Sequence, residues 1–272
     1  MSTLQQITKF FDDAAIFPPG LAPLREAVQA HIARRDDPVS QVVGPFIVPV
    51  AKLAEAATYA GGEKLDVSVI LNSTEVDLLV ETAKKYSNIE IVAVEAKIVD
   101  GLEGIAEIRE RLASTSIFVE LPADLVSADN LKYLRTLGAG LKFRTGGIRQ
   151  ELFPTSQQLI DVLALAIRTE IPFKLTAGLH RAMRYKDEKT GFQHFGFLNV
   201  AAAVKELQSG HGVEAALQIL DSDDAQQVIE VVSRDQQWRT SFQSFGTCSI
   251  AEPLETLADI GFIDTTIFDI EG

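Results

Sequence analysis

The stretch from Gly140 to Thr176 decides the fold. It reads GLKFRT at residues 140–145, QQLIDVLALAIRT at residues 157–169 and FKLT at residues 173–176. In the two short runs apolar and polar residues alternate, which is typical of strands, whereas the longer run repeats apolar residues at helical spacing. A strand, a helix and a second strand in this order predict two parallel strands joined by a crossover helix.

The same unit repeats along the chain. We expect eight strands, at Ala14 to Pro18, Pro45 to Val50, Asp66 to Asn72, Ile89 to Ala96, Ser116 to Leu121, Gly140 to Thr145, Phe173 to Thr176 and Phe242 to Cys248. The clearest helices are expected at Leu24 to Arg34, Glu75 to Tyr86, Ser127 to Leu137 and Gln157 to Thr169. Their starts have residues suited to capping, namely Ser73 or Thr74, Ser127 and Ser156.

Eight strand and helix units favour an α/β fold of the (β/α)8 (TIM) barrel type, and 272 residues suit one such domain spanning residues 1–272. An open doubly wound sheet is the alternative, but no Gly-rich dinucleotide loop follows the first strand. An N-terminal helical segment is expected within residues 1–12. Residues 181–239 form an enlarged helical insertion between strands seven and eight, which is either an elaborated crossover or a lid or subunit contact.

Composition narrows the classes of partner. The net charge of −13 argues against binding nucleic acid or anionic lipid through charge alone. A long apolar run and a signal peptide are both missing from the sequence, so we expect a cytoplasmic protein. The single cysteine, Cys248, cannot form an intrachain disulfide, and no Cys/His spacing suggests zinc. We expect no cofactor or membrane partner, and a homodimer is possible.

Charged residues gather where the strands are expected to end. The fourth and fifth strands carry Glu95 and Glu120, and the sixth carries Lys142 and Arg144. On the seventh strand, Lys174 and Thr176 share one face. Because the apolar face must pack against the helices, we expect both lysines to point into the barrel. Substrates meet barrel enzymes at this end of the strands.

Two lysines on neighbouring strands predict a reactive amine. At about 5 Å and an effective dielectric near 20, two ammonium groups repel by roughly 3 kcal/mol. Burial disfavours the charged form as well, so one lysine should be neutral near pH 7. A neutral amine can attack a carbonyl carbon and form a Schiff base. The alternative is that each lysine forms an ion pair with a carboxylate such as Glu95 or Glu120.

Three separated motifs carry a family resemblance. They are KFRTG at residues 142–146, KLTAGL at residues 174–179 and FGTCS at residues 245–249. Together they resemble the sixth, seventh and eighth strands of class I (Schiff-base) aldolases of the deoxyribose-phosphate aldolase type. The stretch from Ile89 to Leu112 is similar to the fourth unit of that family, more weakly, so the resemblance covers the second half of the chain best.

The resemblance implies specific roles. Lys142 would be the Schiff-base nucleophile, and Lys174 would lower its pKa. The turns after the strands would hold a substrate phosphate or carboxylate through Gly146, Gly147, Thr176, Gly178, Gly246 and Ser249. The substrate would be a small anionic carbonyl compound.

Other residues depart from the family pattern. The fourth-strand aspartate of the family falls at Val92, so Glu95 is the nearest acid and our candidate for proton transfer. Arg144 replaces a small polar residue, and it either grips an anionic substrate or forms a salt bridge with Glu120. His180 could move protons or be a bystander. Asp13 is a secondary candidate.

Three functions follow from these residues. The leading hypothesis is an aldolase-like carbon–carbon lyase without a cofactor. A metal-assisted enolate-forming enzyme would instead use Glu95, Glu120 and His180 as ligands. The third is a barrel that binds a phosphorylated metabolite without turnover.

Overall fold

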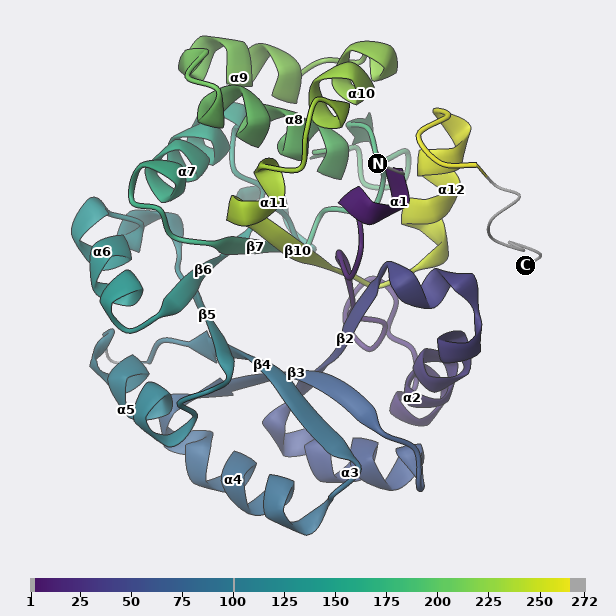
Figure 1. Ribbon diagram of the computed structural model, residues 1–272, viewed down its shortest axis with the longest axis vertical. Helices are drawn as coiled ribbons and strands as arrows, with labels where there is room; N and C mark the ends of the chain where they lie inside the picture. Colours follow the sequence, from purple (N-terminus) through teal and green to yellow (C-terminus); the bar gives the residue numbers. More distant parts are fainter. Residues whose placement is uncertain (1–2, 100, 265–272) are drawn as a thin grey trace.

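The barrel is closed by eight parallel strands. The computed structural model describes residues 3–99 and 101–264, and its strands follow the order β1-β10-β7-β6-β5-β4-β3-β2 around the ring (Figure 1). Their bounds are β1 (Phe11–Asp13), β2 (Val43–Pro49), β3 (Leu65–Asn72), β4 (Ile89–Lys97), β5 (Ser116–Glu120), β6 (Ala139–Arg144), β7 (Phe173–Thr176) and β10 (Phe242–Thr247). The predicted (β/α)8 barrel is confirmed.

A ring of helices covers the outside of the strands. It contains α2 (Leu24–Ala33), α3 (Val50–Ala60), α4 (Val76–Lys85), α5 (Glu103–Arg111), α6 (Ala128–Thr136), α7 (Ser156–Arg168) and α12 (Ala251–Asp259). Outward-facing strand residues such as Phe143 and Leu175 are buried beneath this ring. The opposite face of each strand is thereby left to line the barrel interior.

Two predicted helix caps lie one residue or more away from the observed ones. Ser127 caps α6 as expected, accepting a hydrogen bond from the backbone N–H of Asn130. Thr155, rather than Ser156, caps α7 together with Gln158. Asn72, rather than Ser73 or Thr74, caps the short 3-10 turn Ser73–Glu75 that leads into α4. In both corrected cases a glutamine or glutamate three residues later completes a capping box, which stabilises the helix start.

The first strand is the main correction to the fold. β1 comprises Phe11–Asp13, whereas residues 14–18 form a turn. The predicted N-terminal helix is reduced to α1 (Thr3–Gln6), and residues 1 and 2 lie outside the described residues. Two adjacent aspartates are unusual in a strand, but here each has buried partners: Asp12 faces the barrel interior and Asp13 faces α2.

Aromatic packing joins the first strand to the last. β1 pairs with β10 in parallel register. Behind this seam, the ring of Phe10 lies 5.2 Å from Phe245 and 5.3 Å from Trp238, in edge-to-face contacts. Phe197 stacks on Phe245 at 5.0 Å. Such pairs stabilise the seam beyond the area they bury.

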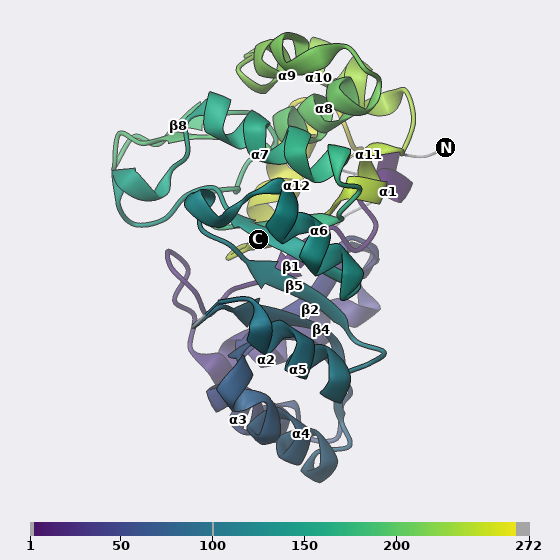
Figure 2. The ribbon, with the colours of Figure 1, turned by 90° about the vertical axis from the view of Figure 1, so that its left-hand side faces the viewer.

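The chain between β7 and β10 divides into a hairpin and four helices. These are β8 (Tyr185–Lys186), β9 (Gln193–His194), α8 (Phe197–Gln208), α9 (Gly212–Leu220), α10 (Ala225–Ser233) and α11 (Trp238–Ser241). Figures 1 and 2 show α8, α9 and α10 stacked outside the barrel next to α7, whereas β8 lies at the end opposite α1. The helices therefore elaborate the crossover, and only the hairpin segment is near the carboxyl ends of the strands. Within the described residues, no helix has the length and apolarity needed to cross a membrane.

Candidate active site

Lys142 and Lys174 lie next to each other inside the barrel. They occupy partnered positions on β6 and β7. Their side chains point inward, and the two residues are only 3% and 1% exposed, respectively. The alternation of the two strands therefore placed both lysines correctly.

Lys174 is held by two carboxylates. Its Nζ donates hydrogen bonds to Asp12 Oδ2 at 2.6 Å and to Glu95 Oε1 at 2.5 Å. Burial alone would lower its pKa, but Asp12 and Glu95 outweigh that effect and raise the pKa above the ordinary lysine value. Lys174 is therefore a fixed cation near neutral pH.

Glu95 bridges the two lysines. Oε1 accepts hydrogen bonds from Lys174 and from Ser68 Oγ, the latter at 2.9 Å, and Oε2 lies 2.7 Å from Lys142 Nζ. Burial would raise the pKa of this carboxyl, but the two ammonium groups lower it to about 2. The carboxylate is therefore ionised at neutral pH, and the role of Glu95 in proton transfer stays a prediction.

Lys142 is held less firmly. Its Nζ lies 2.7 Å from Glu95 Oε2 and 2.9 Å from Glu120 Oε2. Neither oxygen accepts a hydrogen bond of ordinary geometry, within the part of the chain that the structure describes. Glu120 in turn accepts a hydrogen bond from Arg144 at 3.2 Å. The predicted salt bridge between Arg144 and Glu120 is confirmed.

The network runs from the barrel interior to its mouth. The side chains of Asp12 and Glu95 are 2% and 1% exposed, Glu120 is 17% exposed and Arg144 is 41% exposed. Burial tends to raise the pKa of Glu120, but Lys142 and Arg144 lower it. Of the two buried lysines, Lys142 is therefore the one that shares a carboxylate, Glu120, with Arg144 at the mouth.

Charge balance overturns the argument from lysine repulsion. Three cations alternate in space with three carboxylates: Lys174, Lys142 and Arg144 with Asp12, Glu95 and Glu120. Attraction across each contact replaces the repulsion expected of two isolated ammonium groups. The expectation that crowding alone discharges a lysine is therefore wrong, and any neutral amine must arise by proton transfer within the network.

The sequence prediction missed Asp12. Its carboxylate binds Lys174 and accepts a hydrogen bond from Ser244 Oγ at 2.7 Å. Burial raises its pKa in spite of Lys174. The predicted strand began at Ala14, so both aspartates were placed before the barrel. In a strand that starts earlier, as β1 does, the alternation of side chains directs Asp12 into the barrel. Asp13, the candidate we named, faces away from the lysines.

The fourth-strand position was also misjudged. β4 contains a register shift opposite Val67 and Ser68, after which Glu95 faces the lysines. Val92, the residue we matched to the family aspartate, is 37% exposed and lines a cavity near the other end of the strands. An extra residue in a bulge shifts the alternation, which the sequence pattern did not reveal. The fourth strand therefore does supply a carboxylate to the site.

Closely packed turns follow β6 and β7. A Cβ on Gly146 would lie 2.8 Å from Gly178 Cα, and Gly178 has a positive φ of 84°. Only glycine at both positions permits this approach. Thr176 also binds the β6 turn, because its carbonyl accepts from the Thr145 N–H at 3.0 Å.

The remaining predicted site residues lie around the same end. Gly147 follows Gly146 and packs on Leu152, and a Cβ on Gly246 would lie 3.8 Å from Thr176 Oγ1. The Ser249 hydroxyl accepts a hydrogen bond from the Glu252 N–H at the start of α12. The structure thus brings these residues to the carboxyl ends of the strands, where their proposed contacts with a ligand remain predictions.

His180 belongs to a separate cluster beside the mouth. Its Nδ1 lies 3.8 Å from Cys248 Sγ, and its ring is 5.7 Å from that of His194. Burial lowers the pKa of His180, which favours the neutral imidazole.

The metal-site hypothesis finds no matching cluster. Both Glu95 and Glu120 are engaged by lysine, and His180 has other neighbours. Across residues 3–99 and 101–264, no three His, Cys, Asp or Glu side chains are grouped so that they could hold a metal ion.

Comparison with known proteins supports the fold. Neither a protein-family model nor a curated protein matches the chain. A solved structure described as "QR15, an Aldolase" superposes with a TM-score of 0.51 at 13% sequence identity, covering 93% of this chain and 96% of the other. The barrel is thus shared along nearly the whole of both chains with a protein described as an aldolase.

Proposed function

We propose that the chain is an aldolase-like carbon–carbon lyase in which Lys142 forms a Schiff base with an anionic carbonyl substrate. The observation that carries this proposal is the asymmetry between the two buried lysines. Lys174 makes two aligned hydrogen bonds with carboxylates. Among the described residues, Lys142 contacts Glu95 and the partly exposed Glu120 without a hydrogen bond of ordinary geometry.

The nucleophile arises by proton transfer. The Lys142 ammonium gives a proton to the Glu120 carboxylate, 2.9 Å away, which leaves a neutral amine and a carboxylic acid. The amine nitrogen then attacks the carbonyl carbon of the substrate. The Glu120 acid returns its proton to the hydroxyl group of the adduct, which leaves as water, and a protonated imine remains. Cleavage of the neighbouring carbon–carbon bond releases one fragment as a carbonyl compound, whose hydroxyl proton passes to water, and leaves the electron pair of the bond on the imine as an enamine. Protonation of the enamine carbon and hydrolysis of the resulting imine release the second fragment and restore the Lys142 amine.

Lys174 and Glu95 position the reacting lysine. Lys174 stays cationic and is joined to Lys142 through the Glu95 carboxylate. Glu95 holds the two side chains together without taking a proton near neutral pH. In this proposal the proton acceptor is Glu120, which is more exposed than Glu95 and lies beside the mouth.

The anionic group of the substrate would bind to Arg144 and to the turns that contain Gly146 and Gly178. Arg144 has a side chain that is 41% exposed and uses one nitrogen for Glu120, which leaves other donors for a phosphate or carboxylate. The backbone at Gly146 and Gly178 can approach an anion closely because no side chain intervenes.

Reductive trapping tests the proposal. Wild-type protein is incubated with borohydride and a panel of small aldehydes and ketones, with and without a phosphate group, and its intact mass is measured. We expect a stable mass increase with the preferred carbonyl compound that is lost in Lys142→Ala and retained in Lys132→Ala, whose lysine is exposed on α6. A wild-type mass increase that persists in Lys142→Ala contradicts the proposal. Binding of phosphorylated compounds with no adduct would indicate a barrel that binds without turnover.

A further inference from the structure

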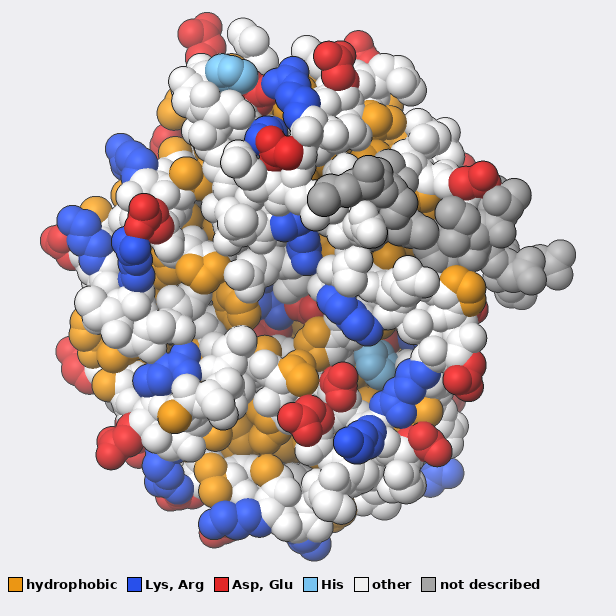
Figure 3. Space-filling model, viewed as in Figure 1, with side chains coloured by type: hydrophobic (Ala, Val, Ile, Leu, Met, Phe, Trp, Pro, Cys, Tyr) orange, Lys and Arg blue, Asp and Glu red, His pale blue; other side chains and the backbone are white. Residues whose placement is uncertain are grey.

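A cavity lies at the amino ends of the strands, away from the lysine residues of the proposed active site. Its volume is about 620 Å³. It is lined by residues that precede or begin β1 to β4, including Lys9, Gly44, Lys64 and Asp66. Figure 3 views the molecule from this end, and Lys, Arg and His side chains gather there with Asp and Glu around the hollow beside β2. Neither the Schiff-base chemistry nor its substrate uses this cavity.

Positive charge predominates in the lining. Four side chains that line the cavity are permanent cations, namely Lys9, Arg34, Arg35 and Lys64, whereas Asp66 is the acidic lining residue. Two of these cations have carboxylate partners outside the lining: Arg34 pairs with Asp13, and Arg35 lies 3.6 Å from Glu63. The whole chain carries a net charge of −13, so this concentration of cations runs against its average. Among the described residues Lys64 has no ion-pair or hydrogen-bond partner for its ammonium group. Such a surplus favours an anionic ligand.

His31 is oriented toward a ligand by a buried carboxylate. Its Nδ1 lies 2.9 Å from Asp13 Oδ2, and Arg34 donates to the same oxygen at 2.9 Å. A carboxylate can only accept, so Nδ1 carries the proton and the imidazole is fixed with Nε2 on the other edge. His31 is 7% exposed and lines the cavity. Asp13 therefore orients the side chains of His31 and Arg34 at the edge of the cavity.

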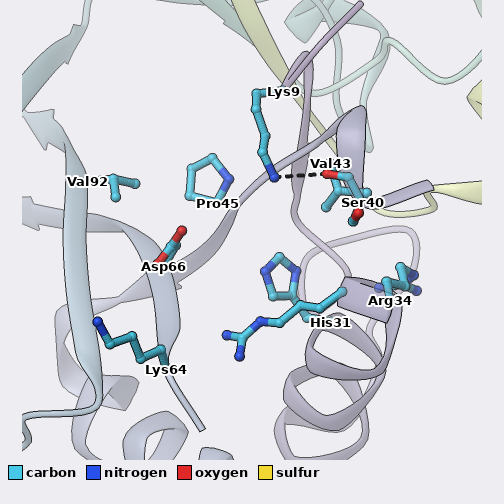
Figure 4. Close-up of a pocket in the computed structure, with 11 residues that line it drawn as sticks. Lys9, His31, Arg34, Ser40, Val43, Pro45, Lys64, Asp66 and Val92 are labelled. Carbon is cyan, nitrogen blue, oxygen red and sulfur yellow. Dashed lines mark hydrogen bonds between the residues drawn. The ribbon is translucent and has the colours of Figure 1, made fainter. Parts of the chain in front are cut away.

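One side of the cavity is apolar. Figure 4 shows Pro45 and Val92 on the side opposite His31 and Arg34, with Lys9 reaching between them and held by a hydrogen bond to the Ser40 carbonyl at 2.9 Å. Val92 is 37% exposed, although it lies within β4. An apolar wall facing oriented cations is the usual composition of a small-molecule site, and the volume lies in the usual range.

We propose that this cavity binds a small organic phosphate monoester with an apolar body. The phosphate, which carries nearly two negative charges at neutral pH, would lie among Arg35, Lys64 and His31. The apolar body would pack on Pro45 and Val92. Since catalytic sites of such barrels lie at the carboxyl ends of the strands, occupancy of this end would serve binding rather than turnover.

Calorimetric titration with phenyl phosphate and inorganic phosphate tests this site. We expect phenyl phosphate to bind about tenfold more tightly than inorganic phosphate, which lacks the apolar body, and neutral phenol to bind at least as weakly as phosphate. Lys64→Ala and Arg35→Ala should each weaken phenyl phosphate binding by about tenfold, whereas Lys132→Ala should leave it unchanged. Val92→Glu should abolish it, because a carboxylate would then occupy the apolar wall.

The Lys142→Ala variant separates this site from the proposed active site. Retained phenyl phosphate binding in Lys142→Ala, together with its loss in Lys64→Ala, places the ligand at the amino end whether or not a Schiff base forms. If phenyl phosphate binding is instead lost in Lys142→Ala and retained in Lys64→Ala, the phosphate binds at the mouth and the inference is overturned. Absence of binding, or equal binding of phenol and phenyl phosphate, would overturn it as well.

Discussion

The two ends of the barrel differ in how their charged side chains are paired. At the carboxyl end three cations and three carboxylates form a connected, mostly buried network. At the amino end cations outnumber the acidic side chains of an open cavity. Charges that are matched and buried stabilise the fold. An ammonium group such as that of Lys64, which has no partner among the described residues and faces a cavity, is available to a ligand. Lys142 lies where the matched network reaches the mouth, which is why we assign the reaction to it.

Replacing Glu95 with Gln should have the largest effect on stability. The change leaves Lys142 and Lys174 buried with a neutral amide between them. Removing one partner of a buried ion pair costs roughly 3–5 kcal/mol in the free energy of unfolding, which urea denaturation would measure. Glu120→Gln is the matched control, and we expect a loss of about 1 kcal/mol because Glu120 is partly exposed. Equal losses would contradict the division into a buried and an exposed part of the network.

Acid should weaken the protein through the same carboxylate. The pKa of Glu95 falls from an ordinary 4.5 to about 2 on folding, so its contribution to stability is complete above pH 4.5 and is lost as the pH falls toward 2. A shift of this size corresponds to roughly 3 kcal/mol. Unfolding free energies of the wild type and Glu95→Gln, measured across this range, should converge at low pH. A difference that stays constant down to pH 2 would show that Glu95 does not stabilise the fold by its charge.

Asp13→Asn links stability to the amino-end cavity. Asp13 accepts hydrogen bonds from the Ala15 N–H and from Arg34, and it contacts His31. The neutral amide should cost about 1–3 kcal/mol in unfolding free energy and weaken phenyl phosphate binding by releasing His31 and Arg34. Normal binding in a destabilised Asp13→Asn variant would show that the orientation of these side chains is unimportant to the ligand.

Lys64→Ala should have the smallest effect on stability. Its side chain is exposed and forms no ion pair with any residue that the structure describes, so the unfolding free energy should change by less than about 0.5 kcal/mol. The same variant should lose phosphate affinity. A large loss of stability would show that Lys64 belongs to the fold and would weaken its assignment to a ligand.

Sequence patterns predicted the features that depend on residues close together in the chain. Alternation placed Lys142 and Lys174 inside the barrel, and helical spacing located α2 and α6 within a residue or two. These features follow from short-range periodicity. The hairpin and extra helices before β10 were foreseen as an insertion, but how they pack depends on tertiary contacts.

The errors arose where distant residues decide the conformation. Asp12 and Asp13 are poor strand formers, and their ion pairs with Lys174 and Arg34 offset this disadvantage in β1. The bulge in β4, which sets Glu95 rather than Val92 against the lysines, likewise depends on pairing with β3. Lysine repulsion was overestimated because Asp12, which completes the charge balance, was not placed inside the barrel.

The identity of the reacting lysine can be measured directly. Wild-type protein trapped with borohydride and a limiting amount of the preferred carbonyl compound would be digested, and the adduct located among its peptides by mass spectrometry. We predict that the modification lies on Lys142 and that Lys174, fixed between Asp12 and Glu95, remains unmodified. Modification of Lys174 in preference to Lys142, or adducts spread only over exposed lysines, would contradict the assignment.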